Sequence, residues 1–176
     1  KGGEKVAVYD AVKGKYVKLK KLENVVMLRG TKVVSQNAGA TLRDMGDGVA
    51  CLEFHTKMNS LDEDVMNMTV ETFDRLENFD GLVIGNEGEN FSAGANLFMM
   101  VVGAQQGMWD MLNGAVRKLQ DMNMRMRYSP KPIVVAPAGL TLGGGCEITM
   151  HASRVVASAE TYIGLVELGV GVIPAG

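Results

Sequence analysis

Two glutamates stand in apolar, glycine-rich surroundings, where a purely solubilising charge is unusual. Glu147 follows three glycines in LGGGCE (142–147), and Glu167 lies between Val166 and Leu168. A carboxyl group that is buried in such a run can give and take protons near neutral pH. The pattern therefore predicts general acid–base chemistry, while a surface or salt-bridged role for Glu167 stays open.

Two segments share the order of an apolar strand, small residues and a helix start. They are GLVIGNEGENFSAGANL (81–97) and PIVVAPAGLTLGGGCEI (132–148). The first N–H groups of a helix have no intrahelical acceptor and lie at the positive end of its dipole, so an anionic oxygen can bind there. Glycines such as Gly94, Gly143 and Gly144 would leave room for that oxygen, although they can also serve only tight helix-to-strand packing.

Together these groups indicate a carbonyl substrate. Backbone N–H donors can hold the oxyanion of an enolate while two carboxylates move protons beside it. Other chemistries lack their motifs, because the chain has no GxxxxGK[ST] phosphate loop, no GxGxxG dinucleotide turn and no GxSxG serine elbow. Cys51 and Cys146 have no CxxC context and are expected to be buried free thiols, and no metal site is expected. His55 and His151 are expected to be structural.

Composition places the chain among one-domain globular proteins. It has 176 residues, 47% apolar content and a formal charge of -2, which gives no electrostatic argument for nucleic acid or an anionic membrane. No run approaches the ~20 apolar residues of a membrane span, and the N-terminus has no signal-peptide core, so a cytoplasmic location is the default expectation. The chain begins without Met and stops at GVIPAG, and both ends are expected to be cut.

The elements that must position the glutamates alternate between strands and helices. Residues 1–40 mix apolar pieces with lysine clusters and are expected to form a linker or connector tail, or a peripheral hairpin, so the domain is expected to span 41–176. This order predicts an α/β fold with sites at the strand-to-helix turns. Strands are expected at 41–45 and 48–54, joined as a hairpin, and at 81–85, 132–140 and 155–158, with helices at 60–79, 109–128 and 148–154.

The chain holds 13 methionines, several of them between residues 99 and 126. Methionine in such a region is expected to fill the core, although an adaptable apolar wall would also suit a long alkyl chain.

Three segments closely resemble motifs of the crotonase, or enoyl-CoA hydratase/isomerase, superfamily. They are FSAGANL (91–97), LGGGCEI (142–148) and ETYIGLVELGVGVIP (160–174), and they stand in the family's order with near-family spacing. The resemblance runs from about residue 40 to the last residue. It implies the crotonase-like (ClpP/crotonase) fold, a spiral of ββα units within the α/β class, truncated here before the family's C-terminal helices.

The resemblance implies hydration of trans-2-enoyl-CoA to 3-hydroxyacyl-CoA, as in fatty-acid β-oxidation. The N–H groups of Ala95 and Gly144 would form the oxyanion hole for the thioester carbonyl, worth roughly 3–4 kcal/mol per donor. Glu147 and Glu167 match the two catalytic glutamates of the hydratases, and having both favours hydration over the family's isomerases. Isomerase or other enolate chemistry, and a non-catalytic acyl-CoA-binding domain, stay open as alternatives.

The resemblance also implies contacts with the acyl-CoA substrate. Lys57, in KMNS, is a candidate partner for the CoA phosphates. The family commonly has aspartate in place of Asn96, and often glycine in place of Ala175, whose N–H could hold the water. The other substrate-binding residues that the resemblance implies are Ala93, Leu97 and Gly143.

The lysine-rich lead-in and the motif variants are most similar to fused prokaryotic proteins in which a 3-hydroxyacyl-CoA dehydrogenase precedes the hydratase. NAD would then belong to the dehydrogenase part, and the hydratase part would need no cofactor besides its acyl-CoA substrate. The family usually forms trimers, so a homo-oligomer is a further expectation.

Overall fold

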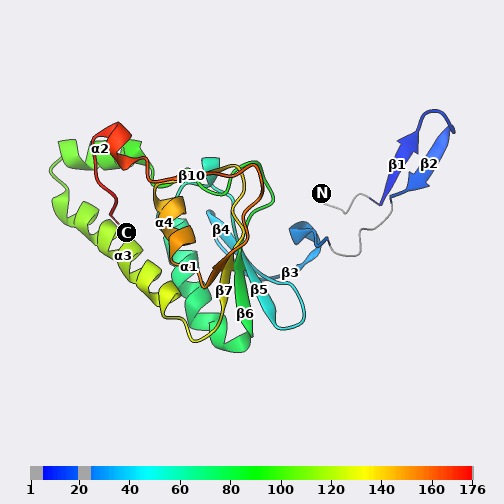
Figure 1. The fold of residues 1–176 in the computed structure, drawn as a ribbon, viewed down its shortest axis with the longest axis horizontal. Helices are drawn as coiled ribbons and strands as arrows, with labels where there is room; N and C mark the ends of the chain where they lie inside the picture. The colour runs from blue at the N-terminus through cyan, green and yellow to red at the C-terminus, as the bar shows by residue number, and fades with distance from the viewer. Residues whose placement is uncertain (1–5, 20–24, 176) are drawn as a thin grey trace.

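A six-stranded sheet forms the centre of the computed structural model, which describes residues 6–19 and 25–175 (Figure 1). The strand order is β3-β4-β5-β6-β7-β9. Strands β3, β4 and β5 pair antiparallel, whereas β5, β6, β7 and β9 run parallel, so the predicted α/β class is confirmed. The strands are β3 (Lys32–Gln36), β4 (Ala40–Asp44), β5 (Val49–Phe54), β6 (Gly81–Ile84), β7 (Ile133–Val135) and β9 (Arg154–Val155).

Four α-helices and two small sheets complete the described part of the chain. The small sheets pair β1 (Ala7–Asp10) antiparallel with β2 (Lys15–Lys18), and β8 (Leu140–Leu142) parallel with β10 (Tyr162–Gly164). The α-helices are α1 (Glu63–Arg75), α2 (Leu97–Gln105), α3 (Trp109–Arg127) and α4 (Gly144–Met150), and the 3-10 turns are η1 (Leu28–Gly30), η2 (Lys57–Asn59), η3 (Leu76–Asn78) and η4 (Glu167–Val170).

The predicted hairpin and the first predicted helix are both confirmed. The turn between β4 and β5 contains Gly46 and Gly48 at φ 85° and 73°, a backbone region that glycine adopts without steric cost. Helix α1 begins where Asp62 Oδ1 accepts a hydrogen bond from the Val65 N–H at 2.9 Å. Such a cap satisfies one of the orphan donors of the first turn, which explains why the helix starts there.

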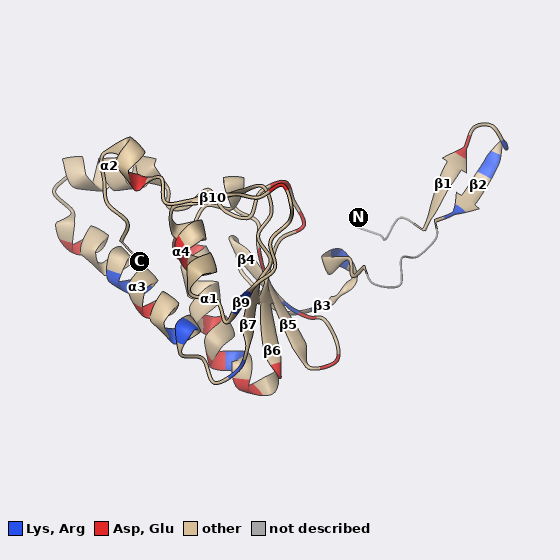
Figure 2. Cartoon of the chain, in the orientation of Figure 1, with Lys and Arg blue, Asp and Glu red and all other residues tan. Residues whose placement is uncertain are grey.

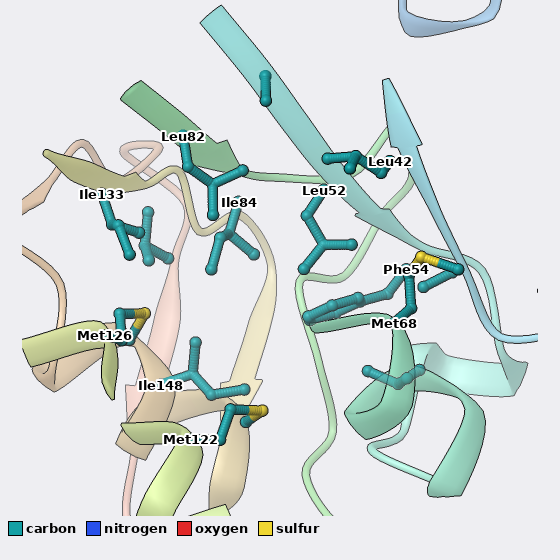
Figure 3. Packing of buried hydrophobic residues seen from close by; sticks show 14 of the residues in the cluster. Leu42, Leu52, Phe54, Met68, Leu82, Ile84, Met122, Met126, Ile133 and Ile148 are labelled. Carbon is teal, nitrogen blue, oxygen red and sulfur yellow. The ribbon is translucent and has the colours of Figure 1, made fainter. Parts of the chain in front are cut away.

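The hydrophobic core lies between the sheet and a layer of helices (Figure 3). Apolar side chains of the parallel strands meet the buried faces of α1, α3 and α4, so the apolar periodicity of the long helix at 109–128 is explained by its packing. Some of the methionines fill this core as expected. The labelled core residues of Figure 3 are Leu42, Leu52, Phe54, Met68, Leu82, Ile84, Met122, Met126, Ile133 and Ile148.

Helix α4 differs from the helix predicted at 148–154, because it starts at Gly144 and ends at Met150. Glycine is a poor helix former, but tertiary packing overrides this weak preference here, since every residue from Gly144 to Thr149 is buried. A Cβ on Gly145 would lie 2.8 Å from Ser92 Cβ and 2.9 Å from Ser92 O. Only glycine at position 145 lets the helix approach the 91–95 segment this closely.

The segment 1–40, expected to be a linker or connector tail or a peripheral hairpin, includes the β1–β2 hairpin and strand β3. Because β3 pairs with β4, the main sheet extends back to Lys32. The division of the chain at residue 41 stays a prediction, and residues 1–5 and 20–24 lie outside the described part.

Figure 2 shows acidic and basic residues interspersed along α1 and α3. None of the described helices is long and apolar enough to cross a membrane.

The two cysteines are buried free thiols, as predicted. Burial raises the pKa of the Cys51 thiol to about 12, and the negative charge of Glu53 adds to the shift. Burial also raises the pKa of Cys146, and the charges of Glu167 and Glu147 raise it further. Because the thiolate is the reactive form, both residues should react slowly in the folded protein.

Alkylation by iodoacetamide at about pH 8, near the pKa of a free thiol, tests this expectation. Peptide mass spectrometry should find Cys51 and Cys146 unmodified while the protein is folded and rapidly modified after denaturation in guanidinium. Rapid modification of Cys51 in the folded protein would contradict the burial described here.

Candidate active site

The two small-residue turns lie side by side, although they are far apart in the sequence. Ser92 and Thr141 form a parallel bridge. The Ser92 N–H donates to Leu140 O at 3.0 Å, and the Leu142 N–H donates to Ser92 O at 2.9 Å. These hydrogen bonds hold the 91–95 segment alongside β8, so the starts of α2 and α4 line a common cavity.

Gly94 allows this close approach. Its φ is 83°, and a Cβ on it would lie 2.8 Å from Leu142 O and 3.1 Å from the Gly144 nitrogen. Its own N–H donates to Ser92 Oγ at 3.1 Å, and its carbonyl oxygen accepts from the Leu61 N–H at 2.9 Å. Gly94 therefore serves tight packing, the alternative role that the sequence left open for these glycines. The absence of a side chain at this position lets the two turns approach each other.

The two N–H groups that the resemblance assigns to the oxyanion hole are available to a ligand. Among the described residues, the N–H groups of Ala95 and Gly144 donate to no protein acceptor. Gly144 is the first residue of α4, where an N–H has no intrahelical partner. By contrast, the Gly143 N–H donates to Gly164 O at 3.0 Å and the Ala93 N–H to Met58 O at 3.1 Å. The N–H groups of Ala95 and Gly144 are thus available to an oxyanion, as the resemblance implies.

Glu147 lies in the first turn of α4 and is only 4% exposed. Its Oε1 accepts a hydrogen bond from the Ala175 N–H at 3.0 Å. That N–H, which the sequence suggested could hold a water, therefore binds a carboxylate in this structure. His151, which caps the end of α4, donates from Nδ1 to Glu147 O at 2.7 Å, a structural contact of the kind predicted.

Glu167 begins η4, and its side chain reaches back over the α4 start. A Cβ on Gly143 would lie 2.8 Å from Glu167 Oε1, so the bare backbone at 143 makes room for this carboxylate. Glu167 Oε2 is buried and accepts no hydrogen bond from any described residue. A buried carboxylate oxygen without a donor is costly, which points to a donor supplied by a ligand or water. No salt-bridge partner of Glu167 exists among the described residues.

A cavity of about 690 Å³ joins these groups. Both glutamates, both free N–H donors and all but one of the predicted binding residues line it. The exception is Lys57, which is exposed in η2 outside the cavity, so its contact with CoA phosphates stays a prediction. The predicted binding residues on the cavity wall are Ala93, Asn96, Leu97, Gly143 and Ala175.

Asn96 has a structural role that the sequence did not reveal. Its Oδ1 accepts from the Met99 N–H at 3.4 Å and caps α2. Asparagine and aspartate are both good N-cap residues, so this role does not need the negative charge.

Much of the remaining cavity wall is apolar and was not identified from the sequence. It includes side chains of α2 and α3, and several are methionines, so the adaptable-wall role of methionine also occurs in this chain. A local pattern could not separate these methionines from those of the core, because only the packing of α2 on α3 decides which ones face the cavity. The residues are Met66, Met99, Met100, Met111, Leu112, Val116 and Leu119.

The described residues contain no group of histidines, cysteines and carboxylates that could hold a metal ion. The carboxylates and backbone N–H groups on the cavity can supply proton transfer and oxyanion binding.

Comparison with known proteins gives consistent matches. The profile of the family described as Enoyl-CoA hydratase/isomerase matches residues 48–175. A "Probable 3-hydroxyacyl-CoA dehydrogenase" of Bacillus subtilis (strain 168) is 43% identical over 176 residues, covering 97% of this chain and 22% of that protein. A "Probable enoyl-CoA hydratase" of the same organism is 32% identical over 132 residues, covering 72% of this chain and 49% of that protein.

Among solved structures, the crystal structure of an enoyl-CoA hydratase from Bacillus anthracis matches with a TM-score of 0.68 at 22% identity. The match covers 78% of this chain and 54% of that one. The chain thus spans about a fifth of the first relative and about half of the other two proteins.

Proposed function

The chain belongs to the enoyl-CoA hydratase/isomerase family, and from that premise we propose that it adds water to trans-2-enoyl-CoA to give 3-hydroxyacyl-CoA. One observation carries the proposal. The carboxylates of Glu147 and Glu167 line the same cavity as Ala95 and Gly144, whose N–H groups donate to no described acceptor. Hydration needs one group to activate water, one to protonate the α-carbon and donors to hold the thioester oxygen.

In the proposed reaction, the thioester oxygen binds between the Ala95 and Gly144 N–H groups. Negative charge develops on this oxygen as water adds to the β-carbon, and fixed donors in a closed site stabilise that charge most. Glu147 takes a proton from the water, and Glu167 gives a proton to the α-carbon. The unsatisfied Oε2 of Glu167 supports a ligand-facing role for this carboxylate. The opposite assignment of base and acid uses the same geometry.

The alternative within the family is double-bond isomerisation, which typically uses one carboxylate. The presence of two carboxylates on one cavity supports hydration instead. A non-catalytic acyl-CoA-binding domain would not need a carboxylate oxygen that is buried without a donor, as Glu167 Oε2 is.

Assays on the full-length natural protein test these options. We expect hydration of crotonyl-CoA to be much faster than isomerisation of a 3-enoyl-CoA. Hydration is measured as the loss of absorbance of the conjugated thioester. Binding of an acyl-CoA by calorimetry with neither reaction would instead support the non-catalytic alternative.

The apolar wall allows a test of the substrate class. Gly114 lies on the cavity wall in α3, and a Cβ placed on it meets nothing within 4 Å. Gly114→Leu should therefore fill open space beside an acyl tail. We expect kcat/KM for a long-chain 2-enoyl-CoA to fall at least about tenfold relative to crotonyl-CoA, since losing room for a few methylenes costs about 1–3 kcal/mol.

Unfolding would not explain such a change in selectivity, because replacing a mid-helix glycine favours the helix by up to about 1 kcal/mol. The matched control is Asn113→Leu, at an exposed neighbour that does not line the cavity. Equal losses for short and long substrates would contradict an acyl-binding role for this wall.

The first relative's name supports a longer natural protein with a dehydrogenase part, to which NAD would belong. The cytoplasmic location and the homo-oligomeric state stay predictions.

A further inference from the structure

We propose that Gln120 of α3 is a positioning residue for Glu147. The inference rests on the proposed hydratase function, and it starts from one contact. Gln120 Nε2 donates a hydrogen bond to Ala175 O, and the N–H of the same Ala175 donates to Glu147 Oε1 at 3.0 Å. Gln120 thus holds the residue that in turn holds the catalytic carboxylate.

Helix α3 is a firm platform for this contact. Met122 and Met126 are 2% exposed and belong to the core. Arg125 Nη2 lies 2.7 Å from Asp74 Oδ1 of α1, and its guanidinium lies 5.5 Å from the Phe73 ring centroid. The position of the Gln120 side chain is therefore set by a helix that is fixed to the rest of the fold.

Among the described residues, few contacts hold the segment that carries Ala175. Its neighbour Ile173 is 75% exposed, and Leu168 of η4 is 81% exposed. The described hydrogen bonds of Ala175 are the one from Gln120 and the one to Glu147. Without the Gln120 amide, the Ala175 N–H would lose its anchor to α3, and the orientation of Glu147 Oε1 would become less defined.

The sequence alone gives no signal for this role. Gln120 is an exposed polar residue on an amphipathic helix, and such residues ordinarily face solvent. Only the close approach of the 172–175 segment gives its amide a partner.

Kinetics of the full-length protein with crotonyl-CoA test the proposal. Gln120→Met keeps the length of the side chain and removes its donors, whereas Gln120→Lys keeps a donor. We expect Gln120→Met to lower kcat about threefold to tenfold, the effect of losing one neutral hydrogen bond, with KM changed less than about twofold. Gln120→Lys should restore most of kcat. The matched control is Gln105→Met, an exposed glutamine of α2 outside the cavity.

A second measurement does not depend on activity. Hydrogen exchange followed by mass spectrometry should show faster exchange of the 170–175 peptide in Gln120→Met than in the wild type and Gln120→Lys. Unchanged exchange, an unchanged kcat, or an effect on KM alone would overturn the positioning role. Absence of hydration in the wild type would instead refute the proposed function, and the exchange result would still decide whether Gln120 holds the Ala175 segment.

Discussion

Replacing Glu147 by glutamine in the full-length protein is expected to lower kcat for crotonyl-CoA hydration about a thousandfold, because a positioned acid or base contributes roughly 10²–10⁴-fold. The glutamine carbonyl can still accept from the Ala175 N–H, so the local structure should persist. KM should change little, since the oxyanion donors and the cavity wall remain. Glu167→Gln should have an effect of similar size, because each carboxylate handles a different proton.

The control for both variants is Glu89→Gln, at an exposed glutamate outside the cavity. It should have wild-type kinetics. Retained hydration in either Glu147→Gln or Glu167→Gln would refute the two-carboxylate mechanism and leave a one-carboxylate reaction of the family as the better explanation.

The second large effect is expected for Gly94→Ala. Its Cβ would meet two backbone atoms, Leu142 O and the Gly144 nitrogen, and backbone cannot move aside as a flexible side chain can. A positive φ costs about 1–2 kcal/mol for an L-residue and overpacking typically adds 1–3 kcal/mol, so we expect a loss of about 3 kcal/mol in the free energy of unfolding. Hydration should fall about 100-fold even where the protein remains folded, because the turns that carry the oxyanion donors are forced apart.

The control variant Gly46→Ala separates the backbone cost of a positive φ from the steric clash that a Cβ makes at position 94. Gly46 has φ 85°, close to that of Gly94 at 83°, but a Cβ on it meets nothing within 4 Å. This variant should show only the backbone cost and keep full hydration. Denaturant unfolding followed by circular dichroism, together with the hydratase assay, compares the two. Equal behaviour of both variants would contradict the close approach at Gly94.

Local pattern was sufficient for the elements whose boundaries depend on nearby residues. The Gly-Asp-Gly turn predicts the β4–β5 hairpin, and the pattern of residues 60–79 predicts a helix there, because turn geometry and capping are short-range effects. The start of α4 could not be predicted in this way. Three glycines argue against a helix, and only contact with Ser92 explains why Gly145 lies inside one.

In the candidate site, too, local motifs predict some residues, whereas long-range packing determines others. The motifs pick out Ala95, Gly144, Glu147 and Glu167, and the structure brings all four to one cavity. The crotonase resemblance is confirmed by the family match and the fold by the solved hydratase structure. The Gln120 contact could not be predicted, because it depends on long-range packing that leaves no periodic trace in the sequence.

The bridge between Ser92 and Thr141 also has a consequence for the order of folding. The oxyanion donors, the Leu61 contact that fixes one of them and the two glutamates come from segments that are distant in the sequence. Closing such long loops is entropically costly, and the parallel pairs of the main sheet, such as Leu82 with Ile133, close loops of similar length. The site should therefore form together with the parallel sheet, and a partly folded chain in which these distant segments are unpaired should lack activity even when its helices are present.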